Sequence, residues 1–384
     1  MEERLQRLEK GFEELKSVNE TLLAENASLR KQLDLVASEA KTPVVRPSGK
    51  PEKLQFGGFV QVQGEAGDAV ASRFADDGDR IFVRRARLSA SGNFARHIDY
   101  RLESEFAGTL GNSSAMRAQM TDGYVTFTHW PAATIRTGQF KTPFGFEQLV
   151  SDTKLATPER SVINDMLTPG RQLGVQLAGD IAGKRLSYAL GAFNGNASNT
   201  SFNDGDNFMV AARLSALLAG SSGGSKSLRI GVNGYTSEDE SVSVSPALGL
   251  DSTPATPARD NVFAGTRTGY GIDAQFVAGR TEIWAEYLAT DFEPLKGLHS
   301  DVSASGWYAQ AGYFALPGTI QVVGKYESND PSDLRTGDDA DVFWLGANWF
   351  LQSHDIKLQF FYAIDDAESA DGSGRVVARV QTVF

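Results

Sequence analysis

The sequence predicts an all-β transmembrane barrel of about 16 antiparallel strands, preceded by an N-terminal α-helical coiled coil. Two observations predict the barrel. From Leu54 onward, segments alternate apolar and polar side chains and are separated by short and long connections in turn, and the last strand stops on an aromatic residue, Phe384. Lipid-facing and lumen-facing residues alternate in such barrels, and aromatic residues gather at both membrane boundaries. A heptad pattern near the N-terminus predicts the coiled coil.

Composition excludes several other classes of protein. The longest apolar run, Leu214 to Ala219, is far shorter than the roughly 20 residues that a membrane-spanning helix needs, so a helical membrane protein is excluded. The chain has no cysteine, which rules out disulfides, thiolate metal sites and a cysteine nucleophile. Met1 leads directly into charged residues, so we expect that a secretory signal has been removed from this numbering.

Residues 1–40 are predicted to form a coiled coil. Apolar residues recur there at alternating spacings of three and four, with two asparagines at core positions that fix register and strand number. Arg4 and Glu9 flank Leu5 and Leu8 in a pattern that resembles a short trimerisation signature. A helix lying on a membrane is the alternative, but its apolar face would be wider and its polar face basic. The seam residues are Arg4, Leu5, Leu8, Glu9, Phe12, Leu15, Asn19, Leu22, Asn26, Leu29 and Leu33.

Residues 41–53 contain three prolines, which prevent the helix from continuing, so they are expected to form an extended tether. Residues 54–384 then form the barrel. Short turns are expected around 95–97, 131–133, 182–184, 279–280, 316–318 and 352–354, and long loops near 67–79, 142–170, 195–207, 237–268, 291–303, 328–340 and 364–374. An even strand number places both barrel ends, and therefore the coiled coil, on the periplasmic side.

Alternation is clearest in residues 355–362. Ile356, Leu358 and Phe360 are expected to face lipid, whereas Lys357 and Gln359 are expected to face the lumen. A soluble β-sandwich would show similar alternation. Its inward face, however, would not need aromatic residues at so many strand ends, so the barrel is favoured.

Several short motifs stand out along the predicted barrel. They are TGQFKTPFGFE at 137–147, which is the most specific, GGFVQ at 57–61, VRRARL at 83–88, DGYV at 122–125, TPERS at 157–161 and PGRQLG at 169–174. These motifs resemble those of the phosphate-selective porins (porin O/P type) of the Gram-negative outer membrane. The resemblance implies a sixteen-stranded trimeric channel in which the loop near 142–170 folds inward and narrows each pore.

Anion selection needs fixed cations along a narrow aqueous path, and the arginine fork suits phosphate. By strand parity Arg85 and Arg87 face the lumen, whereas Arg84 falls on the other face, at the rim or at a subunit contact. The alternative is that these arginines only pair with Asp99, Glu103 and Glu105 across strands. Together with what the resemblance implies, the expected ion path contains Arg84, Arg85, Arg87, Arg101, Asp122, Lys141, Arg160 and Arg171.

The net charge of −11 argues against an anion channel, but the acidic residues cluster in expected loops and not at the expected ion path. Those clusters indicate solubility or, more weakly, divalent cations that bridge to lipopolysaccharide. The sequence therefore predicts a trimeric outer-membrane porin that prefers small anions such as phosphate. The alternative is a general porin whose coiled coil tethers the outer membrane to peptidoglycan. No catalytic motif appears, so we expect no enzyme, cofactor, metal site or nucleic-acid partner.

Overall fold

The computed structural model describes Lys16 and residues 53–68, 70, 78–94, 97–107, 118–130, 132–250, 262–295, 300–365 and 373–384. The chain divides into two compact units, Met1–Lys50 and Pro51–Phe384. The predicted coiled-coil seam and residues 41–52 of the predicted tether lie outside the described residues and stay predictions. Within the described residues, no helix is both long enough and apolar enough to cross a membrane.

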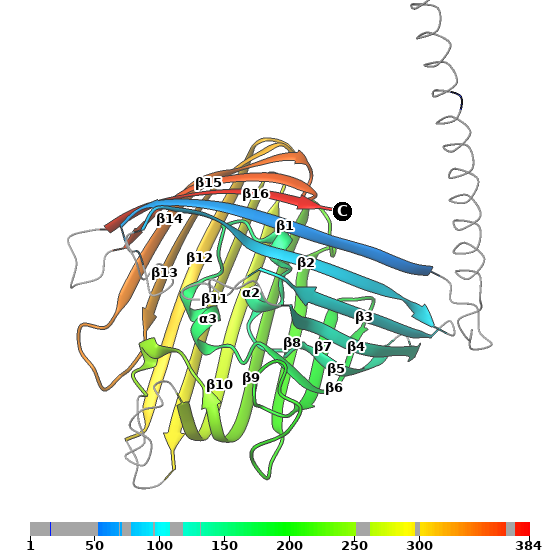
Figure 1. The fold of residues 1–384 in the computed structure, drawn as a ribbon, viewed down its shortest axis with the longest axis vertical. Helices are drawn as coiled ribbons and strands as arrows, with labels where there is room; N and C mark the ends of the chain where they lie inside the picture. The colour runs from blue at the N-terminus through cyan, green and yellow to red at the C-terminus, as the bar shows by residue number, and fades with distance from the viewer. Residues whose placement is uncertain are drawn as a thin grey trace, which may run out of the picture. The chain divides into compact units, whose positions relative to one another are not determined.

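The second unit is a closed barrel of sixteen antiparallel strands, which confirms the predicted fold class (Figure 1). Each strand pairs with its neighbours in sequence, and β1 closes the barrel against β16. The strands are β1 Lys53–Gly67, β2 Arg80–Phe94, β3 Ile98–Glu105, β4 Gln119–Trp130, β5 Ala133–Lys141, β6 Arg171–Ile181, β7 Leu186–Phe193, β8 Met209–Gly220, β9 Lys226–Ser243, β10 Val262–Ala278, β11 Thr281–Pro294, β12 Val302–Leu316, β13 Ile320–Asp330, β14 Ala340–Gln352, β15 Ile356–Asp365 and β16 Ser373–Val383.

Connections at one end of the barrel have two to five residues, whereas those at the other have seven to 29. We call these the short-turn end and the long-loop end. Both ends of the barrel chain lie at the short-turn end, where the terminal Phe384 and Gly58 exchange two backbone hydrogen bonds. The sequence analysis missed the short turn at 221–225 and the long connection at 106–118. It also predicted too long a loop between β9 and β10, since only 244–261 separate these strands.

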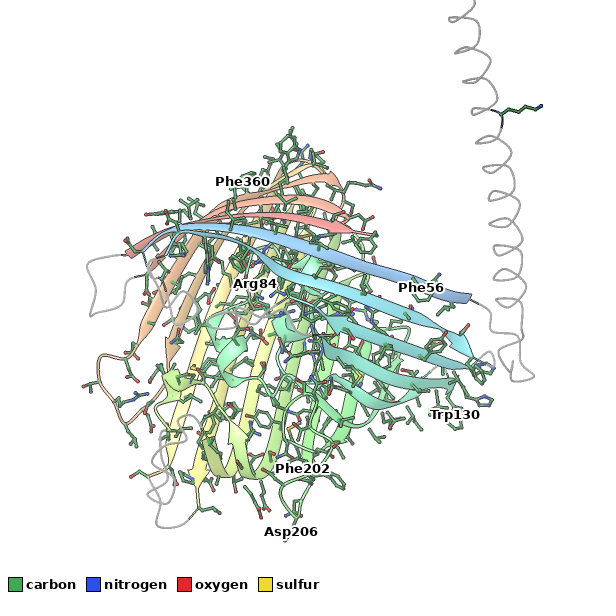
Figure 2. The ribbon with its side chains drawn as sticks, viewed as in Figure 1. Phe56, Arg84, Trp130, Phe202, Asp206 and Phe360 are labelled. Atoms are coloured by element: carbon green, nitrogen blue, oxygen red, sulfur yellow. The ribbon has the colours of Figure 1, made fainter. Side chains whose placement is uncertain are left out.

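Side-chain burial is inverted relative to that of a soluble protein. The outward-facing Phe56, Ile81 and Phe360 are 78%, 84% and 55% exposed. Phe56 and Phe360 are labelled in Figure 2. Arg375 and Arg379 on β16 are 0% and 1% exposed. This arrangement is expected when apolar side chains face lipid and polar side chains face a filled lumen.

The loop between β5 and β6, Thr142–Gly170, lies inside the barrel and carries three short helices, α2 Phe146–Leu149, η1 Asp152–Lys154 and α3 Val162–Leu167. Helix α3 contacts β11, β12 and β13 (Figure 1). A fourth short helix, η2 Pro246–Leu248, lies in the loop between β9 and β10. The inner apolar cluster joins both loops to the wall and contains Phe140, Phe144, Ile163, Met166, Leu167, Phe193, Met209, Tyr235, Leu248, Leu288 and Tyr308.

Candidate functional site

The inward loop is closed at its base and shaped by glycine. Thr142 donates its backbone N–H and its hydroxyl to the Gly170 carbonyl, at 2.9 and 3.1 Å. Gly145 has a φ of 76°, and a Cβ there would lie 2.7 Å from the Thr168 side chain. Because other residues rarely adopt such backbone angles, this glycine lets the chain turn directly into α2.

Asp152, in the middle of the loop, is bound by three arginines. Arg87 on β2 and Arg160 in the loop approach its carboxylate at 2.7 and 2.6 Å, and Arg85 on β2 lies 3.3 Å away. Burial alone would raise the pKa of Asp152, but the charges of these arginines outweigh it and hold the pKa well below its usual range. The carboxylate therefore stays ionised and fixes the loop to β2.

Glu159 makes a second set of ion pairs further along the loop. Both of its carboxylate oxygens accept from Arg84, at 2.7 and 2.8 Å, and Arg85 and Arg379 also bind it. Burial raises the pKa of Glu159, whereas Arg84, Arg379 and Arg85 lower it, and the net pKa is well below the usual range. We call this set the arginine clamp: Arg84, Arg85, Arg87, Arg160 and Arg379 around Asp152 and Glu159.

Arg84 reaches the lumen because β2 contains a β-bulge. Gln61 on β1 pairs with Arg85, but the next residue, Val62, pairs with Val83, so Arg84 has no partner on β1. An extra residue of this kind changes which face the following side chains occupy. The structure therefore places Arg84 against the loop beside β2, and not at a rim or subunit contact as strict parity predicted (Figure 2).

The other side of the loop is held by carboxylates of the barrel wall. Glu286 on β11 accepts hydrogen bonds from the backbone N–H groups of Phe146 and Glu147 at the start of α2. Glu327 on β13 accepts from Val162 N–H, the first residue of α3, at 2.7 Å. Helix N-termini carry unpaired N–H groups and partial positive charge, so a carboxylate stabilises them. We call Glu286 and Glu327 the carboxylate cap.

Two lysines of the barrel wall also donate hydrogen bonds to backbone carbonyl oxygens of the loop. Lys357 on β15 donates to the Thr153 and Leu155 carbonyls at 3.2 and 2.8 Å. Lys141 on β5 donates to the Gln148 and Val150 carbonyls at 2.5 and 3.0 Å. Lys141 thus supports the loop, and within the described residues no carboxylate lies within ion-pair distance of its ammonium group.

A cavity of about 490 Å³ remains between the loop and the wall, and we call it the loop cavity. Its lining includes four cations, Arg87, Arg101, Lys141 and Arg171, and three carboxylates, Glu103, Asp122 and Asp152. Arg171 binds Asp122 at 2.8 Å, and Arg101 binds Glu103 at 2.5 Å. The side chains that line the cavity therefore carry an excess of one positive charge.

The structure thus brings all eight predicted path residues to the lumen. Five of them line the loop cavity, whereas Arg84, Arg85 and Arg160 act on the loop itself. Sequence reasoning missed Asp152, Glu159, Glu286 and Glu327, which hold the loop in place. The sequence offered only a weak signal for these residues: Asp152 and Glu159 lie in the expected inward loop near 142–170, and Glu159 is part of the TPERS motif.

Acidic residues also gather at the long-loop end. One carboxylate oxygen from each of Asp330, Asp338 and Asp339 lies within 4.8 Å of the others. Arg335 approaches Asp338 at 3.3 Å, which already offsets part of this negative charge.

Comparison with known proteins identifies similar sequences and folds. A family model for phosphate-selective porin O and P matches residues 59–379. Porin O of Pseudomonas aeruginosa is 21% identical over 321 residues, which cover 76% of this chain and 72% of that protein. An anion-selective porin from Comamonas acidovorans has a TM-score of 0.59 at 14% identity, covering 86% of this chain and 99% of that one. OmpT, an outer membrane protein of Vibrio cholerae solved in a trimer form, has a TM-score of 0.58 at 11% identity, covering 86% and 99%.

Proposed function

This chain belongs to the phosphate-selective porin O and P family of the outer membrane, and from this we propose that it forms a trimeric, water-filled channel that prefers small anions, including phosphate. The names of Porin O and of the anion-selective Comamonas porin support the preference, and the trimer form of OmpT supports the assembly. In this channel, the inward loop forces solutes past the cations of the loop cavity.

The charge balance of the loop cavity carries the proposal. Each of its three side-chain carboxylates lies within 4.0 Å of an arginine, whereas the Lys141 ammonium, among the described residues, binds only backbone carbonyls. Fixed charges act over a Debye length of about 8 Å at physiological salt, so this local excess outweighs acidic residues on distant loops. Anions are held weakly enough to move on, as conduction requires.

Ion preference can be measured as the zero-current potential across a planar bilayer in a potassium chloride gradient. We expect the full-length protein to prefer chloride and Lys141→Gln to reduce that preference, whereas Lys141→Arg should retain most of it. Lys226→Gln, which removes the same charge from the start of β9, is the control and should change little. A wild-type preference for potassium, or an unchanged potential in Lys141→Gln, would favour the general porin instead.

We also propose that residues 1–40 lie in the periplasm as a three-stranded coiled coil and bind peptidoglycan. Both ends of the barrel chain lie at the short-turn end, which supports this side for the helix. Protease added to intact cells should leave the 41–53 segment uncut. Full-length protein should sediment with purified peptidoglycan, whereas a variant lacking residues 1–40 should not. If both proteins sediment to the same extent, residues 1–40 do not bind peptidoglycan.

At the opposite end, we propose that the long loops contact lipopolysaccharide. The grouping of Asp330, Asp338 and Asp339 supports weak bridging by divalent cations. Chelation of divalent cations should then release lipopolysaccharide that copurifies with the protein. If the amount of bound lipopolysaccharide is the same after chelation, the proposed bridging is wrong.

A further inference from the structure

Arg136 on β5 is a lumen arginine that the sequence analysis did not single out. Its Nε–H donates to the Thr126 hydroxyl at 3.1 Å. Its guanidinium carbon lies 4.3 Å from the centroid of the Tyr124 ring and 5.5 Å from that of Phe140. Stacking on an aromatic face and one hydrogen bond hold the planar group in a single orientation.

The terminal nitrogens of Arg136 lack a protein partner. Throughout the part of the chain that the structure describes, no carboxylate lies within 4.0 Å of this guanidinium, and neither Nη group donates to a protein acceptor. Most lumen arginines differ, as Arg87, Arg171 and Arg379 each pair with at least one carboxylate. An oriented guanidinium with free donors favours a ligand that brings its own anionic oxygens.

Arg136 lines a second cavity, of about 560 Å³, which we call the mouth cavity. This volume falls within the range of roughly 300–1,000 Å³ that is typical of sites for organic ligands. The mouth cavity shares Gln55, Ser91 and Arg101 with the loop cavity, so the two are neighbours along one path.

Most of the other polar side chains of the mouth cavity are neutral: Gln55, Ser91, Asn93, Thr126, Thr128 and Thr134. Asp99, its one acidic residue, accepts a hydrogen bond from Asn93 at 2.8 Å. Among the described residues, the side chains of Gln55, Ser91 and Thr128 have no protein hydrogen-bond partner. They can therefore both donate to and accept from hydroxyl groups of a solute.

We propose that the mouth cavity binds hydroxylated organic anions, with the anionic group on Arg136 and the hydroxyl groups on Gln55, Ser91 and Thr128. This inference rests on the proposed function as an anion channel and extends its solutes beyond inorganic ions. A solute that leaves the loop cavity exchanges its contacts there for those of Arg136. Two neighbouring sites of moderate strength favour passage over trapping.

The test is block of the chloride current of the full-length channel in planar bilayers, with glucose 6-phosphate, inorganic phosphate or glucose added at the short-turn side. Glucose 6-phosphate should block at a lower concentration than inorganic phosphate, and glucose should not block. Arg136→Gln should raise the half-blocking concentration of glucose 6-phosphate about tenfold, the effect of one charge-assisted contact. Arg229→Gln is the matched control and should change little, because Arg229 also faces the lumen, has no carboxylate partner among the described residues and lines neither cavity.

The hydroxyl contacts are tested by Ser91→Ala combined with Thr128→Val. This variant should raise the half-blocking concentration of glucose 6-phosphate by about threefold to tenfold, because neutral hydrogen bonds are lost, and should leave that of inorganic phosphate unchanged. Wild-type chloride conductance shows that each variant has folded. The site would be overturned if Ser91→Ala with Thr128→Val shifted the half-blocking concentrations of glucose 6-phosphate and inorganic phosphate equally. It would also be overturned if Arg136→Gln and Arg229→Gln changed the half-blocking concentration of glucose 6-phosphate by the same factor.

The zero-current potential separates this inference from the proposed function. A channel that prefers chloride but shows the same glucose 6-phosphate block in wild type and Arg136→Gln contradicts only the mouth-cavity site. A channel that prefers potassium contradicts the proposed function as well.

Discussion

Arg84 shows how one inserted residue changes the chemistry of the lumen. In a regular strand, Arg84 and Arg85 would face opposite sides of the barrel wall. The bulge in β2 turns both toward Glu159, and Arg84 makes the bidentate pair while Arg85 bridges Glu159 and Asp152. Two adjacent arginines can therefore bind one loop, which a regular strand could not achieve.

The arginine clamp should resist acid. Because the pKa values of Asp152 and Glu159 are lowered in the folded protein, their ion pairs contribute stability above the usual carboxyl pKa of about 4 and lose it only as pH falls through the lower folded-state values. We expect the wild type to show fewer loop-related current interruptions than Glu159→Gln, which breaks the clamp, at every pH from 7 to about 4.

Glu159→Gln should produce such interruptions already at pH 7, since breaking a buried ion pair costs about 3–5 kcal/mol. Glu240→Gln, an exposed carboxylate on β9, serves as the control and should behave as wild type. Equal interruption frequencies in the wild type and Glu159→Gln at pH 5 would show that the clamp is weaker than its geometry indicates.

At the scale of elements, the inward loop is attached to both sides of the barrel. The arginine clamp joins it to β2 and β16, and the carboxylate cap joins α2 and α3 to β11 and β13. The loop therefore spans the lumen between these two sets of contacts, and the width of the loop cavity depends on both of them.

Replacing Glu327, one of the two residues of the carboxylate cap, should weaken the attachment of α3 to the barrel wall. In Glu327→Ala the first N–H of α3 loses its acceptor, at a cost of about 1–3 kcal/mol for a buried unpaired group. We expect larger current noise and a weaker chloride preference in the zero-current potential.

Glu282→Ala is the matched control, because Glu282 lies on β11 and bonds Gln321 on β13 at 3.3 Å, with no bond to the loop among the described residues. If both variants have the same noise, the cap does not position α3.

The sequence predicted those features of the barrel that depend on local pattern. The two-residue alternation in 355–362 holds in the structure, where Lys357 and Gln359 are buried in the lumen and Phe360 is exposed on the outer face. The partners of the loop could not be predicted, because Glu327 and Val162 lie 165 positions apart and Arg379 and Glu159 lie 220 apart. No periodic pattern encodes such pairs, and the bulge at Arg84 likewise depends on the register with β1.

At the scale of the whole molecule, we predict a homotrimer, because the heptad pattern of residues 1–40 predicts three strands and because OmpT of Vibrio cholerae, which has a similar fold, was solved in a trimer form. Deleting residues 1–40 should weaken the trimer without abolishing it, since contacts between barrel walls remain. Light scattering of detergent-solubilised protein measures the mass directly. A wild-type monomer or dimer would contradict the prediction.

The bond between Arg379 and Glu159 also has a consequence for the order of folding. Arg379 lies on the last strand, so this bond forms only after synthesis of the whole chain and pairing of β16. Bringing together residues 220 positions apart carries a large chain-entropy cost, and such contacts form late and slowly. The channel therefore acquires its constriction as the barrel wall closes, and a nascent barrel that lacks β16 would have an incompletely anchored loop.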